Sequence, residues 1–208
     1  TGELDQYQNF DCEMAQGLLA EAGYPDGEGF PAQELKLRGE TDARAQWWIA
    51  SAASISDCLN VEITVNNMEF NSFMSALLAR PTGVQFGAVS YGMDYLDPSN
   101  MLGVWVSTGR HSWRSAEFDQ LVNDANVLVG DLETRDQMYR DAERLLVEDV
   151  GGIFLVHRIQ GDLLQPYVSG ECFRPDAQGV SAWHWGNDWC WGTFYITNDV
   201  MNYDTYRD

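Results

Sequence analysis

The segment SYGMDYLDPSN, residues 90–100, contains two tyrosines and two aspartates directly after VQFGAV, residues 84–89, which has the composition of a buried strand. In open α/β sheets, ligands bind beyond the carboxyl ends of the strands. An aspartate at such a strand end holds a ligand ammonium by a charge-assisted hydrogen bond, and a tyrosine packs against the adjoining apolar surface. We therefore predict that Asp94 binds a ligand, with Tyr91 and Tyr95 beside it.

Two other interpretations of these aspartates stay open. Asp97 precedes Pro98, and Asp-Pro is typical of a turn, while Asp94 could instead cap a backbone N–H. An acid/base pair of Asp94 and Asp97, as in glycoside hydrolysis, is the third interpretation. Three residues apart in one loop is a poor spacing for flanking a sugar ring, and the sequence has no HExxH, GxSxG, P-loop or GxGxxG motif. We expect no enzymatic activity.

The segment VSTGRHSWRS, residues 106–115, supplies basic groups in an otherwise acidic chain. Arg110 and His111 are candidates to receive a ligand carboxylate. The alternative is a solvated loop whose cations pair with nearby acids.

The charge balance excludes several partners. The chain has 32 acidic and 12 basic residues and a net charge of −20. Nucleic acids and anionic membranes both require Lys and Arg, so neither is expected as a partner. No apolar run approaches the roughly 20 residues that cross a bilayer. We expect an exported protein or a fragment of one, with its signal already removed, and neither a cofactor nor a metal.

Four cysteines allow three disulfide pairings. We favour Cys12 with Cys58 and Cys172 with Cys190, because each pair then lies within one local region. A zinc site of Cys172, His184 and Cys190 matches no common ligand spacing.

Strand and helix patterns alternate, which predicts an α/β fold. Strand, helix and strand over residues 33–66 form a βαβ unit, so those strands should be parallel. Met14, Leu18, Leu19 and Ala22 define the expected apolar face of a helix over residues 11–22. The other expected elements are helices over residues 69–79, 115–128 and 131–150, and strands over residues 84–90 and 152–157.

Beyond Pro166 the periodicity is lost. We predict one lobe over residues 1–170, with a mixed sheet flanked by helices, and an irregular tail over 171–208 that packs on it. The tail carries Trp183, Trp185, Trp189 and Trp191, which hairpin packing explains. A carbohydrate-binding surface module built on these tryptophans is the alternative.

Several segments, in order, resemble the C-terminal lobe of the family 5 extracellular solute-binding proteins. They are DCEMAQGLLAEAGYPDG, NVEITVNNMEFNSFMSALL, SYGMDYLDPSNML, FDQLVNDA, TRDQMYRDAERLLVEDVGGIFLVH and PYVSG, and together they cover about residues 10–170. The chain departs from the family at Ser90-Tyr91, where Gly-Trp is common, and near Gly151-Gly152, where prolines are common.

The resemblance implies a periplasmic-binding-protein type II-like lobe of a dipeptide, oligopeptide or nickel receptor of an ABC importer. It places Asp94 where peptide-binding members grip the ligand's α-amino group, with Tyr91 as a wall of the pocket. The implied partners are a peptide or small polar solute, an N-terminal lobe of the same receptor and a membrane permease. The implied location is periplasmic or extracellular, with lipoprotein anchoring as one form.

Overall fold

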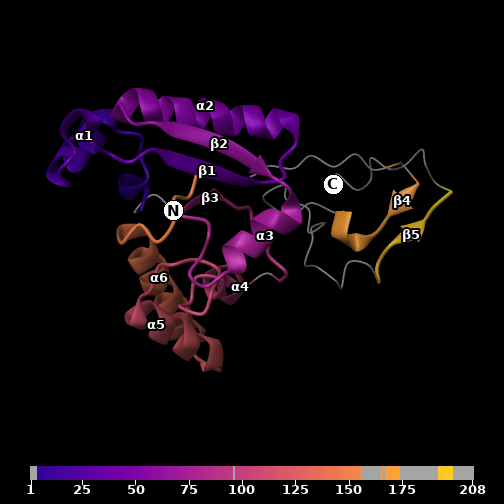
Figure 1. Cartoon of the computed structure of the whole chain (residues 1–208). Coiled ribbons are helices and arrows are strands. Elements are labelled where there is room, and N and C mark those ends of the chain that lie inside the picture. The colour runs from indigo at the N-terminus through magenta and orange to yellow at the C-terminus, as the bar shows by residue number, and fades with distance from the viewer. Residues whose placement is uncertain (1–3, 96, 156–164, 166, 174–191, 199–208) are drawn as a thin grey trace.

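The computed structural model describes residues 4–95, 97–155, 165, 167–173 and 192–198. Its helices and strands follow one another along the chain (Figure 1). In order they are η1 (Asp5–Tyr7), α1 (Cys12–Glu21), η2 (Pro25–Gly27), β1 (Gln33–Arg38), α2 (Asp42–Leu59), β2 (Ile63–Met68), α3 (Phe70–Leu78), β3 (Phe86–Ala88), α4 (Pro98–Gly103), α5 (Ala116–Val127), α6 (Leu132–Glu148), β4 (Val168–Ser169), η3 (Glu171–Phe173) and β5 (Tyr195–Ile196).

The main sheet has the strand order β2-β1-β3, and β1 pairs in parallel with both neighbours. Helix α2 lies along the outer face of β1 and β2 (Figure 1). Leu35 and Leu37, two residues apart on β1, are 2% and 0% exposed, and they pack with Ala52 of α2 and Ala88 of β3. The parallel βαβ unit expected from the sequence is therefore confirmed.

A second core joins α4, α5 and α6. Ser115 and Asp131 cap the amino termini of α5 and α6, each side chain accepting a backbone N–H, and Gly130 between the helices has φ of +90°. The buried residues are Leu102, Phe118, Val122, Ala125, Tyr139, Ala142 and Leu146. Figure 1 places this helical hairpin on the side of the sheet opposite α2. The helix pair divided at Gly130 is as expected.

Two sequence expectations about the elements differ from the structure. The strand expected over 152–157 is absent from its described part, residues 152–155, where Ile153, Phe154 and Leu155 are 64%, 42% and 52% exposed and pair with no described strand; residues 156 and 157 lie outside the described residues. The described strands of the main sheet are all parallel, and the antiparallel pair β4–β5 forms a separate sheet. The second difference concerns helix α1.

Helix α1 has no buried residue, and Met14 and Leu18 of its expected apolar face are 61% and 56% exposed. The reason is that α1 is held by its other side. The predicted disulfide Cys12–Cys58 is present, and the Gln16 amide donates to the Cys58 carbonyl over 2.7 Å. These contacts fasten α1 to the carboxyl end of α2 and leave the stripe of Met14 and Leu18 facing outward.

The described part of the tail is small. Strand β5 pairs with β4, and Phe173 stacks on Phe194 at 4.8 Å between ring centroids. Cys172 is buried and disulfide-bonded, and its predicted partner Cys190 lies outside the described residues. Also outside them lie His184 and the four tail tryptophans, Trp183, Trp185, Trp189 and Trp191, so the carbohydrate-module alternative stays a prediction.

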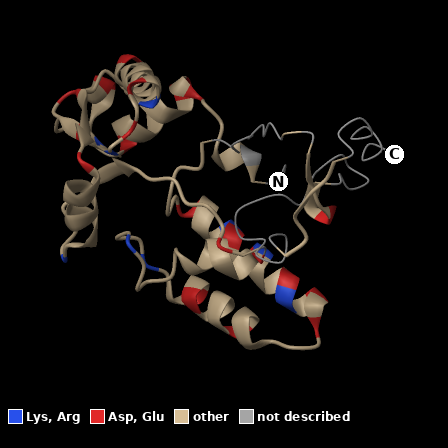
Figure 2. Cartoon of the chain, turned by 90° about the vertical axis from the view of Figure 1, so that its right-hand side faces the viewer, with Lys and Arg blue, Asp and Glu red and all other residues tan. Residues whose placement is uncertain are grey.

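Acidic residues are distributed along several helices and loops of the chain (Figure 2). Within the described residues no helix is both long enough and apolar enough to span a bilayer.

Candidate functional site

The candidate site lies where the parallel strands end. Strands β1, β2 and β3 run in the same direction, so their carboxyl ends meet at one edge of the sheet. Beyond β3, residues 89–95 have no regular structure, and Asp97 caps the amino terminus of α4. The segment with the predicted ligand residues therefore starts at the strand end that the sequence indicated.

Asp94 is exposed, and its carboxylate is oriented by two neighbours. The Tyr91 hydroxyl donates to Oδ2 over 2.8 Å, and the Asn100 amide nitrogen lies 3.4 Å from the same oxygen. The Asn100 side-chain oxygen in turn accepts the Asp94 backbone N–H at 3.0 Å. The hydrogen bond to Asp94 raises the pKa of Tyr91, so this hydroxyl stays protonated and remains a donor at neutral pH.

Tyr95 does not touch Asp94 in any described contact. Its hydroxyl lies 3.2 Å from the Ser99 hydroxyl, and its side chain is 50% exposed. Tyr91 is 39% exposed. Both rings therefore offer surface to a ligand next to Asp94, and a ligand role for either stays a prediction.

The Asp97 carboxylate makes hydrogen bonds that stabilise the fold. It caps α4 by accepting the Ser99 backbone N–H at 2.9 Å, and Pro98 takes the first helical position. The Arg135 guanidinium of α6 donates to both Asp97 carboxylate oxygens, at 2.8 and 2.9 Å. This hydrogen-bonded ion pair lowers the pKa of Asp97 from 3.8 to about 2.

These contacts answer the question of an acid/base pair. A carboxyl with a pKa of about 2 is ionised at neutral pH, so it has no proton to give as a general acid. The environment of Asp97 therefore fits a helix-capping and ion-pairing role better than the role of a general acid. The turn expected at Asp97-Pro98 is in fact the start of helix α4, which the sequence analysis did not anticipate.

The Asp97–Arg135 pair makes a pH-dependent contribution to stability. Since the folded-state pKa is lower than the unfolded one, the contribution is complete above about pH 5 and is lost as the pH falls through 4 toward 2. The lowered pKa corresponds to about 2 kcal/mol as an upper figure, which solvent screening of this partly exposed pair reduces.

We therefore expect Arg135→Met to lower the free energy of unfolding at pH 7 by up to about 2 kcal/mol, measured by urea denaturation. The difference from wild type should shrink between pH 4 and pH 2. The control is Arg140→Met, the same substitution at an exposed position of α6, which should change little. A deficit in Arg135→Met that is independent of pH would contradict this role of the pair.

The loop with Arg110 and His111 is arranged differently from the prediction. The His111 ring lies 5.0 Å from Trp105 and 6.3 Å from Trp113, measured between centroids. Both ring nitrogens are buried, and neither has a hydrogen-bond partner in the described part of the chain. Burial, and to a smaller degree the Arg114 charge, lowers the pKa of His111 despite nearby backbone groups that favour its charged form.

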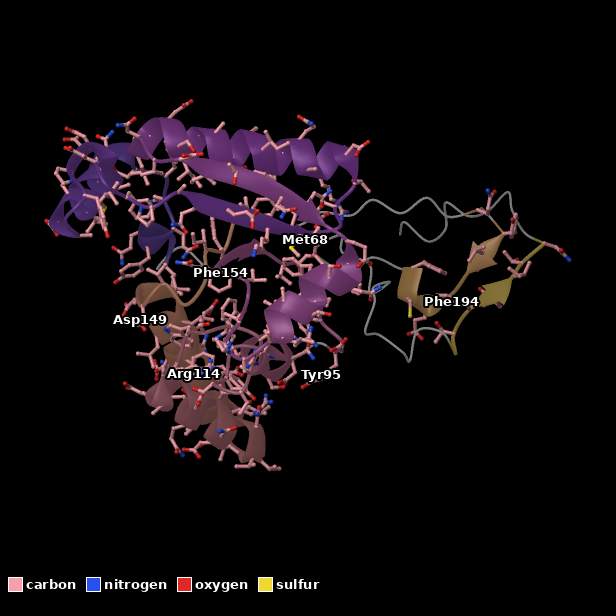
Figure 3. The ribbon with its side chains drawn as sticks, viewed as in Figure 1. Met68, Tyr95, Arg114, Asp149, Phe154 and Phe194 are labelled. Carbon is pink, nitrogen blue, oxygen red and sulfur yellow. A yellow bond between two sulfur atoms is a disulfide. The ribbon has the colours of Figure 1, made fainter. Side chains whose placement is uncertain are left out.

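His111 therefore offers no ring nitrogen to a ligand in this structure, because two indoles enclose it. Arg110 is exposed, and its ligand role stays a prediction. Figure 3 shows Arg114 of this loop and Tyr95 of the strand-end segment apart from each other in that view.

A cavity of about 300 Å³ lies on the side of Arg114 and is lined by Trp113, Ser115, Leu145, Glu148 and Asp149. The Trp113 indole N–H donates to Asp149, another lining residue, over 2.6 Å. It includes none of the predicted ligand residues. Within the described residues, no group of His, Cys, Asp or Glu side chains is placed to hold a metal ion.

Sequence reasoning missed two residues of the strand-end edge. Asn100, 8% exposed, organises Asp94, and no pattern distinguishes it from an ordinary helix residue. Arg38 ends β1, donates to the Ser90 hydroxyl at 3.3 Å and lies 5.6 Å above the Phe70 ring. No carboxylate of the described residues lies within 4.0 Å of its guanidinium. A signal was available for Arg38, since an arginine at a strand end is unusual in so acidic a chain.

No family model matches the chain. It is 25% identical over 171 residues to the probable deoxycholate-binding periplasmic protein YgiS of Escherichia coli, covering 81% of this chain and 31% of that protein. It is 26% identical over 162 residues to the periplasmic oligopeptide-binding protein OppA of Salmonella typhimurium, covering 76% of this chain and 29% of that protein.

Among solved structures, the fold is similar to Haemophilus influenzae OppA in complex with the peptide RPPGFSPFR. The TM-score is 0.67 at 20% identity, over 89% of this chain and 34% of that one. The chain thus spans about a third of the length of the relatives it matches. The predicted resemblance is confirmed: the curated relatives and the solved structures that this chain resembles are periplasmic solute-binding proteins of the oligopeptide-binding type, and they share the fold of part of their length with it.

Proposed function

We propose that this chain is a non-catalytic ligand-binding lobe of an ABC-importer receptor, and that it holds the ammonium group of a peptide or similar small polar solute on Asp94. The observation that carries the proposal is the position of Asp94. It is an exposed carboxylate just beyond the carboxyl end of a parallel strand, oriented by Tyr91 and Asn100. Relatives named as oligopeptide-binding support the ligand class.

Arg38 supports a ligand with charges of both signs. Its guanidinium donates to the Ser90 hydroxyl, four residues before Asp94, and lies 5.6 Å from the centroid of the Phe70 ring. An arginine without a carboxylate partner among the described residues has donors available for a ligand carboxylate. A zwitterionic ligand would then meet Asp94 with its amine and Arg38 with its carboxylate.

The proposed receptor has more than this lobe. Residues 1–170 belong to the lobe, and a second, N-terminal lobe encloses the ligand by hinge closure. The closed form is what a membrane permease recognises, outside the cytoplasmic membrane, in the periplasm or at the cell surface. Because one lobe supplies only part of the contact surface, we expect weak, millimolar affinity from this chain alone.

The test compares two probes, trialanine and N-acetyl-trialanine, titrated into the chain at pH 7 and followed by amide NMR shifts. The acetyl group removes the ammonium and leaves the rest of the peptide unchanged. We expect trialanine to bind about tenfold more tightly, the equivalent of one charge-assisted hydrogen bond.

Equal affinities for the two probes would contradict the role of Asp94. Micromolar affinity of this chain for trialanine would contradict the need for a second lobe.

A further inference from the structure

The two oxygens of the Asp94 carboxylate are in different states. Oδ2 accepts the Tyr91 hydroxyl at 2.8 Å, and the Asn100 amide nitrogen lies 3.4 Å from it. Oδ1 has no hydrogen-bond partner in the part of the chain that the structure describes. A carboxylate oxygen has about two lone-pair sites, so Oδ2 is occupied by the protein and Oδ1 is open.

Cations differ in the number of oxygens they require. A guanidinium binds a carboxylate through two parallel N–H donors, one to each oxygen. An ammonium is a compact charge whose donors rotate, and one oxygen is enough for it. Asp94 can therefore bind an ammonium fully through Oδ1 alone. For a guanidinium it offers only one of the two oxygens that a bidentate contact requires.

The two side chains next to Oδ2 differ in how firmly the fold holds them. Asn100 is buried, and its side chain is also tied to the Asp94 backbone N–H. Tyr91 is partly exposed and reaches Asp94 by its hydroxyl alone. Removing that hydroxyl would free one acceptor site on Oδ2 with little disturbance to the fold.

On these contacts we infer that Tyr91, supported by Asn100, makes the site selective for a primary ammonium over a guanidinium. The inference rests on the proposed function, in which Asp94 binds the ligand cation. Tyr91 is then a specificity-determining residue. Its hydroxyl occupies Oδ2 and so prevents a bidentate contact, in addition to its ring forming a wall of the pocket.

The experiment uses trialanine and its N-amidino derivative, in which a guanidine replaces the terminal amine at the same charge. Binding to the chain is measured by amide NMR shifts at pH 7. For wild type we expect about tenfold preference for the amine, because the guanidinium brings its second paired N–H against the occupied Oδ2 and leaves that donor without an acceptor, whereas the donors of an ammonium rotate toward Oδ1 or solvent. In Tyr91→Phe the preference should fall to threefold or less, through tighter binding of the guanidine.

The matched control is Tyr95→Phe, which removes the same atom four residues away. The Tyr95 hydroxyl contacts Ser99 and not Asp94, so this variant should keep the tenfold preference. Unchanged amide shifts outside residues 89–100 establish that each variant is folded.

The inference is overturned if wild type binds the two probes equally, or if Tyr91→Phe and Tyr95→Phe retain the same preference. That outcome differs from a failure of the proposed function, in which trialanine binding does not depend on Asp94. If neither probe binds, both proposals are overturned together.

Discussion

The Asp94→Asn variant is expected to bind trialanine about 30-fold more weakly than the wild-type chain, which removes binding from the measurable range. The substitution keeps the shape of the side chain and an oxygen that can accept the Tyr91 hydroxyl, but it removes the charge that the ammonium requires. Asp94 is exposed, so the free energy of unfolding should change by no more than about 0.5 kcal/mol.

Asp136→Asn is the control for this change. It removes the same charge from an exposed position on α6, and it should leave the affinity for trialanine within about twofold of wild type, since long-range charges are screened in physiological salt. Trialanine affinity that survives in Asp94→Asn, or that falls equally in both variants, would leave Asp94 without a specific role.

Replacing both Cys12 and Cys58 by serine is expected to lower the free energy of unfolding by about 2–4 kcal/mol. The disulfide closes a sequence separation of 46 residues, and the chain-entropy model assigns a loop of that size about 4 kcal/mol. Helix α1 buries no residue, so little else holds it to α2. Urea denaturation measures the loss, and hydrogen exchange should show α1 losing protection first.

Substitution is better than a reducing agent here, because Cys172 is also disulfide-bonded and a reductant would act on both bonds. Gln16→Ala is the control. It removes the hydrogen bond to the Cys58 carbonyl and leaves the covalent bond, and it should cost no more than about 1 kcal/mol. A double serine variant as stable as Gln16→Ala would mean that packing, not the disulfide, fastens α1.

The regular elements could be predicted because their signals are local. Leu35 and Leu37 alternate along β1, and the apolar stripe of α6 repeats at helical spacing, so period alone separates strand from helix. The disulfide Cys12–Cys58 was predicted because both cysteines lie in the amino-terminal part of the sequence, far from Cys172 and Cys190. The strand-end position of Asp94 followed from the order of elements and the rule that parallel strands end at one edge.

What could not be predicted depends on partners distant in sequence. Residues 152–155 have strand composition, yet they pair with no described strand. His111 reads as a loop residue, but Trp105 and Trp113 fold over it. The engagement of Asp97 requires Arg135, which lies 38 residues away on another helix.

The site itself was predicted only in outline. Asp94 and Tyr91 were identified by residue type and place, whereas the role of Asn100 depends on the first turns of α4 folding back toward Asp94. The state of each carboxylate oxygen is a three-dimensional property that no spacing encodes.

The most direct test of ligand binding at Asp94 is a map of backbone amide shifts as trialanine is added to the wild-type chain. If the proposed function is right, the largest shifts fall on residues 38, 89–95 and 100, around the carboxyl ends of β1 and β3. Shifts confined to the cavity of Trp113 and Asp149, or to residues 165–198, with residue 94 unmoved, would contradict it.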